Sequence, residues 1–386
     1  MDNSISAELI GEMSRWRQHL HQHPEFGFEE VQTAAFISEK LHSFGFTEIA
    51  SGVGGTGVVA TLRSGQSNRA IGFRADMDAL RITETGTPPY ASQNPGVMHA
   101  CGHDGHVAML LGAAKALKEN DDFDGVIHFI FQPAEEWGKG MSAMLDDGLL
   151  DRFGMEEAYG IHNMPGIPVG HYATRSGAFM AAEDNFAITI TGSGGHASRP
   201  HDSNDALLAA CATVTALQNI VSRHIDPSQL AVVSVTELLT DGTRNAIAGS
   251  ATILGDTRSY DASVSQKIEA AMRRIANGVA QANDCNATID YTREFVPLSN
   301  DPKLTQYAAT AASNISQHVD AHTPRIGASE DFARLTTHIP GNFMFIGNGD
   351  SAVLHNAAYD FNDAALPYGA GYFVELAKTR LSKSAP

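Results

Sequence analysis

Basic residues are scarce in this sequence, which contains 26 lysines and arginines against 44 aspartates and glutamates and has a formal net charge of −18. No local run of lysine or arginine offsets this deficit. Because an acidic chain repels phosphate backbones and anionic lipid headgroups, we expect neither nucleic acid nor a membrane surface as a partner. The sequence also has no run of about 18 apolar residues, the length that a membrane-spanning helix needs.

Cysteine is almost missing as well. The cysteines Cys101, Cys211 and Cys285 are odd in number and far apart, and Cys211 lies in the apolar, helix-like run ALLAACATVTAL. This pattern argues against a disulfide framework and favours free thiols in a reducing compartment. The beginning of the sequence lacks the basic segment followed by an apolar one that marks a secretory leader, so we expect a cytoplasmic protein.

What the sequence does contain is typical of an α/β protein. Its 386 residues exceed what one hydrophobic core usually serves, and 43% of them are hydrophobic. Strand-like runs alternate with helical stretches, and these runs are GVVATL, AIGFRAD, GVIHFIFQ, AYGIH and VGHYAT. Such alternation indicates a sheet with helices on both faces.

A different order of elements occupies the middle of the chain. It begins with the strand-like NFAITITG and continues with a helix at about 204–223, two strands, a helix at about 263–281 and a last strand. This β-α-β-β-α-β order is a ferredoxin-like motif that can form its own domain. We therefore predict a discontinuous α/β domain at 1–182 and 294–386, with a second domain inserted at 183–293.

A concentration of metal-binding side chains occurs in MHACGHDGH, where Cys101 and His103 are two residues apart. In an extended segment both side chains point the same way, and both are good ligands for Zn²⁺, Mn²⁺ or Co²⁺. Two alternatives remain at this point. Cys101 is either a small buried thiol at the start of a helix or a nucleophile that works with a histidine.

Further candidate ligands follow other predicted strands. The pair Glu135 and Glu136 leaves the strand FIFQ, His162 ends AYGIH, and His355 follows NFMFIG. Adjacent carboxylates point in different directions, so one can bind metal while the other holds a water. Each residue alone is as well explained by an exposed acidic turn or a surface histidine. Taken together, five donors suit two divalent cations that share one ligand. These donors are Cys101, His103, Glu136, His162 and His355.

Two aspartates, Asp76 and Asp78, follow the strand in FRADMDAL. Their spacing places both side chains on one side of the chain. A metal-binding imidazole usually donates its other N–H to a carboxylate, and we assign this role to Asp78. Two turn aspartates without a role in the site are the alternative.

Seven motifs follow one another along nearly the whole chain, and they are LHQHPEFGFEE, RADMDAL, MHACGHDGH, QPAEE, GIHNMPGIPVG, GSGGHASRPH and GASEDFA. In this order they resemble the motifs of the aminoacylase-like metallopeptidases, and within that family the branch of hippurate hydrolases, N-acyl-amino-acid amidohydrolases and indole-acetyl-amino-acid hydrolases. The resemblance implies a mixed-sheet catalytic domain with a two-metal centre, and an inserted lid domain that forms homodimers or homotetramers. It also implies that Cys101 bridges two metals drawn from Zn, Mn, Co or Ni, and that Glu135 is the general base.

The resemblance assigns three residues of the inserted domain as well. His196 would stabilise the oxyanion from the other subunit, while Asn245 and Arg258 would contact the substrate, Arg258 through its carboxylate. A turn histidine, a loop amide and a surface arginine are the respective alternatives. GASEDFA is interpreted as a helix N-cap at Ser329 and stays outside the predicted site.

These observations predict a metal-dependent amidohydrolase that cleaves N-acyl-L-amino acids such as hippurate. A metallo-dipeptidase would use the same centre but would also have to hold a free α-amino group. A non-catalytic binding protein on the same scaffold is a further alternative, against which the intact ligands and Glu135 argue. A cysteine hydrolase would keep its activity in the presence of a chelator.

Overall fold

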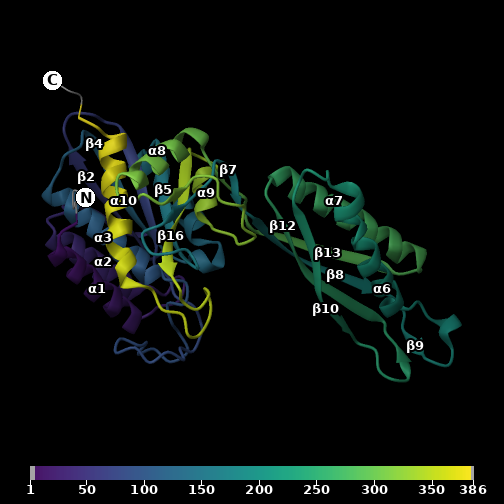
Figure 1. Cartoon of the computed structure of the whole chain (residues 1–386). Helices are drawn as coiled ribbons and strands as arrows, with labels where there is room; N and C mark the ends of the chain where they lie inside the picture. The colour runs from purple at the N-terminus through teal and green to yellow at the C-terminus, as the bar shows by residue number, and fades with distance from the viewer. Residues whose placement is uncertain (1–4, 384–386) are drawn as a thin grey trace. The chain divides into compact units, whose positions relative to one another are not determined.

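The computed structural model of the chain describes residues 5–383 (Figure 1). They form two compact units. The first comprises the chain up to Phe179, then Ser299–Pro324, and the chain from Asp331 onward. The second comprises Met180–Leu298 and Arg325–Glu330. The predicted boundaries assigned 325–330 to the discontinuous α/β domain, whereas Arg325–Glu330 belong to the second unit.

A mixed sheet forms the centre of the first unit, with the strand order β1-β2-β4-β3-β5-β16-β6-β15. These strands are β1 (Glu48–Val53), β2 (Gly57–Ser64), β3 (Ala70–Asp76), β4 (Gly125–Gln132), β5 (Glu157–Pro165), β6 (Tyr172–Ala173), β15 (Val319–Asp320) and β16 (Gly341–Gly349). The central strands β4, β3, β5 and β16 are parallel, whereas β1 and β2 are antiparallel additions. The carboxyl ends of the parallel strands therefore meet at one edge, where open α/β sheets bind their ligands.

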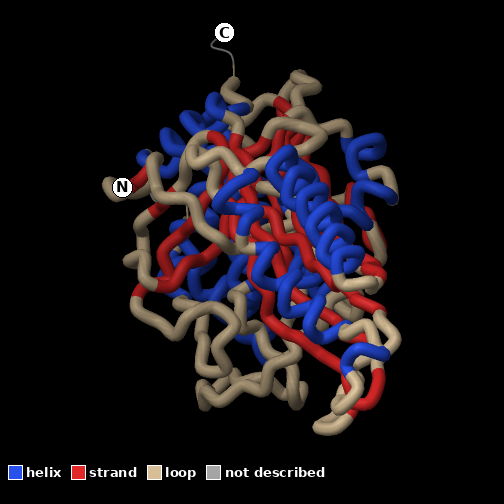
Figure 2. The backbone as a smooth tube through the Cα atoms, turned by 90° about the vertical axis from the view of Figure 1, so that its right-hand side faces the viewer, coloured by secondary structure: helices blue, strands red, loops and turns tan. Residues whose placement is uncertain are grey.

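Helices cover both faces of this sheet (Figure 1), and Figure 2 colours helices and strands along the whole backbone. They are α1 (Ala7–Gln22), α2 (Val31–Ser43), α3 (His103–Glu119), α4 (Gly140–Asp146), α5 (Leu149–Phe153), α8 (Pro302–Ser313), α9 (Phe332–Thr336) and α10 (Leu366–Arg380). Phe73 of β3 contacts Phe373 of α10, with ring centroids 5.0 Å apart. Phe343 of β16 points to the opposite face and contacts Phe332 of α9 at 5.4 Å. This layering explains why every residue of β3 and β4 is buried.

The second unit consists of one antiparallel sheet and two long helices. Its elements follow the chain as β8 (Ala182–Thr191), α6 (Ala206–Leu217), β10 (Ala231–Thr240), β12 (Ser250–Ser259), α7 (Ala262–Ala282) and β13 (Asn286–Phe295). The strands have the order β10-β12-β8-β13, and apolar residues of the sheet and both helices form a separate core. This is the β-α-β-β-α-β order that the sequence predicts.

Short elements complete both units. Two small strand pairs are formed by β7 (Gly177–Met180) with β14 (Leu298–Asn300) and by β9 (Gly195–His196) with β11 (Ala246–Ile247). Single helical turns are η1 (Glu135–Trp137), η2 (Pro200–Asp202), η3 (Ile220–His224) and η4 (Asp363–Ala365). Within residues 5–383, no helix combines the length and the hydropathy that crossing a bilayer requires.

Three predicted elements differ clearly from the structure. The strand-like run VGHYAT forms only the short strand β6 at Tyr172–Ala173. The helix expected at 204–223 ends at Leu217, and a π-helical turn follows at Ile220–His224. The strand expected to end at His162 continues to Pro165, because β16 pairs with β5 as far as Pro165. His162 therefore lies inside a strand, with its backbone fixed by the sheet.

Candidate metal centre

The predicted ligands all belong to the first unit and gather at the carboxyl edge of its parallel strands. Cys101 and His103 lie where the chain enters α3, whose N-cap is Gly102. Gly102 has a φ of 89°, and a Cβ there would lie 2.4 Å from Asn163 Oδ1, so this turn requires glycine. Glu136 lies in η1 directly after β4, and His162 lies in β5.

Several groups of three possible ligand atoms come together, and Cys101 belongs to two of them. In each group the atoms all lie within 4.8 Å of one another, and the two groups that contain Cys101 are Cys101, His103, His162 and Cys101, Glu136, His355. The Cys101 Sγ lies 3.4 Å from His162 Nε2, and His355 Nε2 lies 3.3 Å from Glu136 Oε1. The structure thus brings the five predicted donors together, with the sulfur at their common centre.

Hydrogen bonds orient both imidazoles of the first group. His103 Nδ1 lies 3.1 Å from Asp78 Oδ1 and 3.0 Å from the Asp78 carbonyl oxygen, so it must donate. His162 Nδ1 likewise donates to the Asn163 carbonyl oxygen at 2.7 Å. Each ring therefore directs Nε2 to the centre, where this nitrogen can bind metal once it carries no proton.

Asp78 also fixes the second group. Its Oδ2 accepts the backbone N–H of Glu136 at 3.0 Å, while Oδ1 accepts from His103. One buried carboxylate therefore sets the position of a ligand from each group.

The Nε2 atom of His103 is fully buried and has no hydrogen-bond partner among residues 5–383. A bound cation would satisfy this nitrogen.

Electrostatics favour a cation at this position. Burial, with Glu136 and Glu135 nearby, raises the pKa of the Cys101 thiol well above its usual range. Burial alone would lower the pKa of His103, but the carboxylates of Asp76, Asp78 and Glu136 raise it to about 10. Protons would therefore sit on Cys101 and His103 in an ion-free centre. A divalent cation displaces these protons and balances the buried carboxylates, so the donor set fits metal.

Glu135 lies beside these ligands and is also buried. Its carboxylate comes within 4.8 Å of ligand atoms of His103 and Glu136. The turn that carries it starts at Ala134, whose φ of 47° is unusual for a residue with a side chain. The Ala134 N–H donates to the buried carboxylate of Glu30 at 2.9 Å, which holds the turn in place.

Sequence reasoning missed a layer of buried polar residues behind the ligands. The Asp76 carboxylate can only accept, so His106 Nδ1 donates to Asp76 Oδ1 at 2.5 Å. His106 Nε2 lies 2.7 Å from Asn163 Oδ1 and 3.0 Å from the Asn163 backbone nitrogen. Asp76 thereby gains a role that its sequence position left open. The spacing of His103 and His106 on one helix was the available signal, because residues three apart share a helix face.

The interpretation of GASEDFA as an N-cap at Ser329 is wrong. Helix α9 begins at Phe332, and Asp331 occupies the N-cap position without a side-chain capping bond. The Asp331 carboxylate is instead buried, where it accepts from Gln132 Nε2 at 2.7 Å and from the Met141 N–H at 2.9 Å. Its own backbone N–H contacts Glu135 Oε1 at 3.4 Å. Asp331 therefore belongs to the support of Glu135.

A buried arginine ties this support together and provides a stability prediction. Arg74 pairs with Asp76 at 2.7 Å and Asp331 at 3.1 Å, and all three side chains are fully buried. Arg74→Met should lower the free energy of unfolding by about 3–5 kcal/mol, because it leaves buried carboxylates unpaired. Urea denaturation of the metal-free protein measures this. Arg63→Met, at an exposed surface pair with Glu48, should change it by less than about 1 kcal/mol. Equal effects would contradict the expectation.

The remaining predicted residues lie in the second unit. His196, in β9, is exposed, and its Nδ1 accepts from the Ser198 N–H at 3.1 Å. Asn245 is exposed in the turn before β11. Arg258, in β12, pairs with Glu183 and Asp256, each at 2.7 Å, and donates to Ser329 Oγ at 2.9 Å. A role for Arg258 in binding a substrate carboxylate therefore requires it to exchange one of these partners.

Comparison with known proteins adds an independent line of evidence. The profile of the peptidase family M20/M25/M40 matches residues 72–379. The hippurate hydrolase of Campylobacter jejuni is 38% identical over 373 residues, which cover 96% of this chain and 97% of that protein. The N-acyl-L-amino acid amidohydrolase of Geobacillus stearothermophilus is 40% identical over 295 residues, covering 76% of this chain and 79% of that protein.

A solved structure shares the fold over the whole length. The Bacillus subtilis protein described as a dinuclear metal binding peptidase from the M20 family superposes with a TM-score of 0.87. It is 32% identical in sequence, and the match covers 97% of this chain and 99% of that one. Because both chains are covered almost completely, the similarity includes both units and not the metal centre alone.

Proposed function

The chain belongs to the peptidase family M20/M25/M40, and from this premise we propose that it hydrolyses the amide bond of N-acyl-L-amino acids, releasing a carboxylic acid and a free amino acid. The names of the hippurate hydrolase and the N-acyl-L-amino acid amidohydrolase that it resembles support this substrate class. The observation that carries the proposal is the pair of ligand groups that share Cys101, with Glu135 beside them.

Two divalent cations per subunit fit this arrangement. One would be held by Cys101, His103 and His162, and the other by Cys101, Glu136 and His355. Such ions lower the pKa of a bound water to about 7 and polarise a carbonyl oxygen. A thiolate with imidazole and carboxylate ligands suits Zn²⁺, Mn²⁺, Co²⁺ or Ni²⁺.

The residues around this centre have distinct tasks in the proposed reaction. The Glu135 carboxylate takes a proton from the attacking water and gives it to the leaving amine nitrogen, so that both products leave with balanced protons. Asp78 keeps His103 and Glu136 oriented throughout. From the second unit of the other subunit, His196 donates a hydrogen bond to the developing oxyanion. Arg258 binds the substrate carboxylate, and Asn245 contacts the substrate beside it.

An activity panel with matched substrates tests the proposal. Metal-reconstituted protein should hydrolyse N-benzoylglycine and N-acetyl-amino acids, and EDTA should abolish this activity. An unblocked dipeptide with the same C-terminal residue should react more slowly. Preference for the dipeptide would favour a dipeptidase, and lack of EDTA-sensitive hydrolysis across the panel would favour a binding protein. Activity that survives chelation would indicate a cysteine hydrolase.

We further propose that the second unit mediates dimerisation through strand β10. This strand lies at the end of the sheet order, and among residues 5–383 only β12 pairs with it. Val232, Leu238 and Leu239 of β10 are exposed, as is Leu208 of α6. A second copy that pairs with this edge would satisfy its backbone groups and cover its apolar side chains.

Placing a charge on this edge should separate the subunits. Leu239→Lys should convert the wild-type dimer largely to monomer, because lysine on an edge strand opposes pairing with another strand. Light scattering after size-exclusion chromatography measures the mass. Thr288→Lys, on the edge strand β13 at the other side of the sheet, should remain dimeric. A wild-type monomer at micromolar concentration would contradict the proposal.

We also propose a cytoplasmic location for this protein, which the state of its cysteines supports. All three are free thiols in the structure, and Cys101 and Cys285 are buried. A thiolate ligand survives best in a reducing compartment, since oxidation of Cys101 would remove it from the centre.

A further inference from the structure

The loop that carries His355 needs support from outside the metal centre. His355 has a φ of 64°, a left-handed conformation that a residue with a side chain keeps only where the surroundings enforce it. Its side chain is 53% exposed, in contrast to the buried imidazoles of His103 and His162. Little packing around the ring therefore holds it against Glu136.

Anchors on the backbone and on neighbouring side chains hold this loop. The His355 N–H donates to the Ala100 carbonyl oxygen at 2.8 Å, and the Ala357 carbonyl oxygen accepts from the Thr85 N–H at 2.8 Å. Further along, Tyr90 donates its hydroxyl to Asp360 Oδ2 at 2.8 Å. The loop then enters η4 at Asp363.

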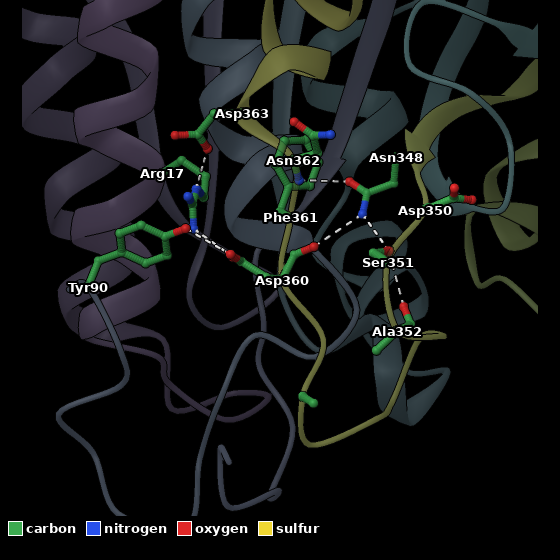
Figure 3. Close-up of a pocket in the computed structure, with 11 residues that line it drawn as sticks. Arg17, Tyr90, Asn348, Asp350, Ser351, Ala352, Asp360, Phe361, Asn362 and Asp363 are labelled. Atoms are coloured by element: carbon green, nitrogen blue, oxygen red, sulfur yellow. Dashed lines mark hydrogen bonds and ion pairs between the residues drawn. The ribbon is translucent and has the colours of Figure 1, made fainter. Parts of the chain in front are cut away.

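Arg17 is the charged anchor of this segment. It projects from α1 and is only 1% exposed, although it lines a cavity of about 430 Å³ together with Tyr90, Asp360 and Asp363 (Figure 3). Its Nε donates to Asp363 Oδ1 at 2.7 Å, and its Nη1 lies 3.4 Å from Asp360 Oδ1. The guanidinium carbon lies 4.1 Å from the centre of the Tyr90 ring. One buried cation thus holds two carboxylates downstream of His355.

The same guanidinium also reaches the start of α3, over a longer distance. Nη1 lies 3.8 Å from Asp104 Oδ2, one residue beyond His103. Asp104 has a closer partner in His21, whose Nδ1 lies 2.8 Å from the same oxygen. Removing Arg17 would therefore leave Asp104, next to His103, in contact with His21. Asp360 and Asp363 would lose their cation.

We propose that Arg17 is a positioning residue for His355, and that it selectively stabilises the ion held by Cys101, Glu136 and His355. This inference rests on the proposed two-metal function. Arg17 touches neither ion. It acts by clamping the loop, so that His355 enters the centre already oriented and less conformational entropy is lost when metal binds.

Mn²⁺ titration of the full-length, metal-free protein tests the proposal. Wild-type protein should bind two equivalents and give the electron paramagnetic resonance signal of a coupled pair. Arg17→Met should bind the first equivalent as wild type does and the second roughly tenfold or more weakly, by analogy with the loss of outer-shell support in other metal sites. At two equivalents its signal should be that of isolated Mn²⁺. Arg15→Met, an exposed arginine on the same helix, is the matched control and should behave as wild type.

A second variant covers the case in which Arg17→Met does not fold. Asp360 is 44% exposed, so Asp360→Ala should fold, and it removes one of the two carboxylates that Arg17 clamps while leaving Arg17 paired with Asp363. This variant should also bind the second equivalent of Mn²⁺ more weakly than wild-type protein does. Unchanged titrations, or equal weakening of both equivalents, would overturn the inference alone. Fewer than two equivalents in wild-type protein would overturn the proposed function, and the inference with it.

Discussion

Replacing Glu135 with glutamine is expected to lower kcat on an N-acyl-amino acid by roughly 10²- to 10⁴-fold, the range typical for loss of a general base. The amide keeps the size and most contacts of the carboxylate, including an oxygen that can accept the Asp331 N–H at 3.4 Å. It cannot take a proton from water. Because Glu135 belongs to neither of the two groups that share Cys101, the protein should still hold two metals.

Glu136→Gln is the matched control, since the same chemical change one residue along falls on a proposed ligand. It should lower the metal content as well as the rate, because the amide is a poorer ligand than the carboxylate. Steady-state kinetics together with metal analysis separate the two variants. A Glu135→Gln protein that turns over at the wild-type rate would remove Glu135 from the mechanism.

Cys101→Ala is expected to have the larger effect, with loss of both metals and of all detectable hydrolysis. Its sulfur is the one atom common to both ligand groups, so each would be left with two protein donors. Loss of an outer-shell partner already costs roughly 10- to 100-fold in affinity, and a shared direct ligand should cost more. Metal analysis after dialysis and a hydrolysis assay measure the outcome.

Cys285→Ala provides the comparison, because Cys285 is also buried but belongs to the core of the second unit. It should retain both metals and wild-type turnover, with at most a modest loss of stability. A Cys101→Ala protein that keeps two metals would show that the thiolate does not bridge them.

Much of the metal centre could be predicted from the sequence because its donors follow a simple geometric rule. Parallel strands end at one edge of a sheet, so residues at or just after β4, β5 and β16 meet there although they are far apart in the chain. Cys101 and His103 join them because they lie at the entry to α3. The resemblance drawn from the motifs is confirmed by the family match and by relatives that align over nearly the full length.

The residues behind the ligands could not be predicted in the same way. Arg74 and Asp331 are 257 positions apart, and Arg17 and Asp363 are 346 apart. No local pattern distinguishes a buried arginine from an exposed one on an amphipathic helix or strand. The motif GASEDFA was misinterpreted for a related reason, since a serine followed by acidic residues usually starts a helix, and only the positions of Arg74 and Gln132 turn Asp331 inward.

The second unit shows a different limit of sequence reasoning. Its order of strands and helices followed from local sequence runs, because each element is at least ten residues long. The partners of Arg258 did not, since Glu183 lies on the neighbouring strand β8 and pairing across strands depends on register. The roles of His196, Asn245 and Arg258 therefore remain predictions that substrate kinetics must test.

Anomalous diffraction from crystals of the Zn²⁺-loaded protein tests most directly whether five separated donors form one centre around paired cations. The account predicts two zinc peaks per subunit, both bonded to the sulfur of Cys101, with His103 and His162 on one ion and Glu136 and His355 on the other. A single peak, or a Cys101 sulfur bonded to neither ion, would contradict it.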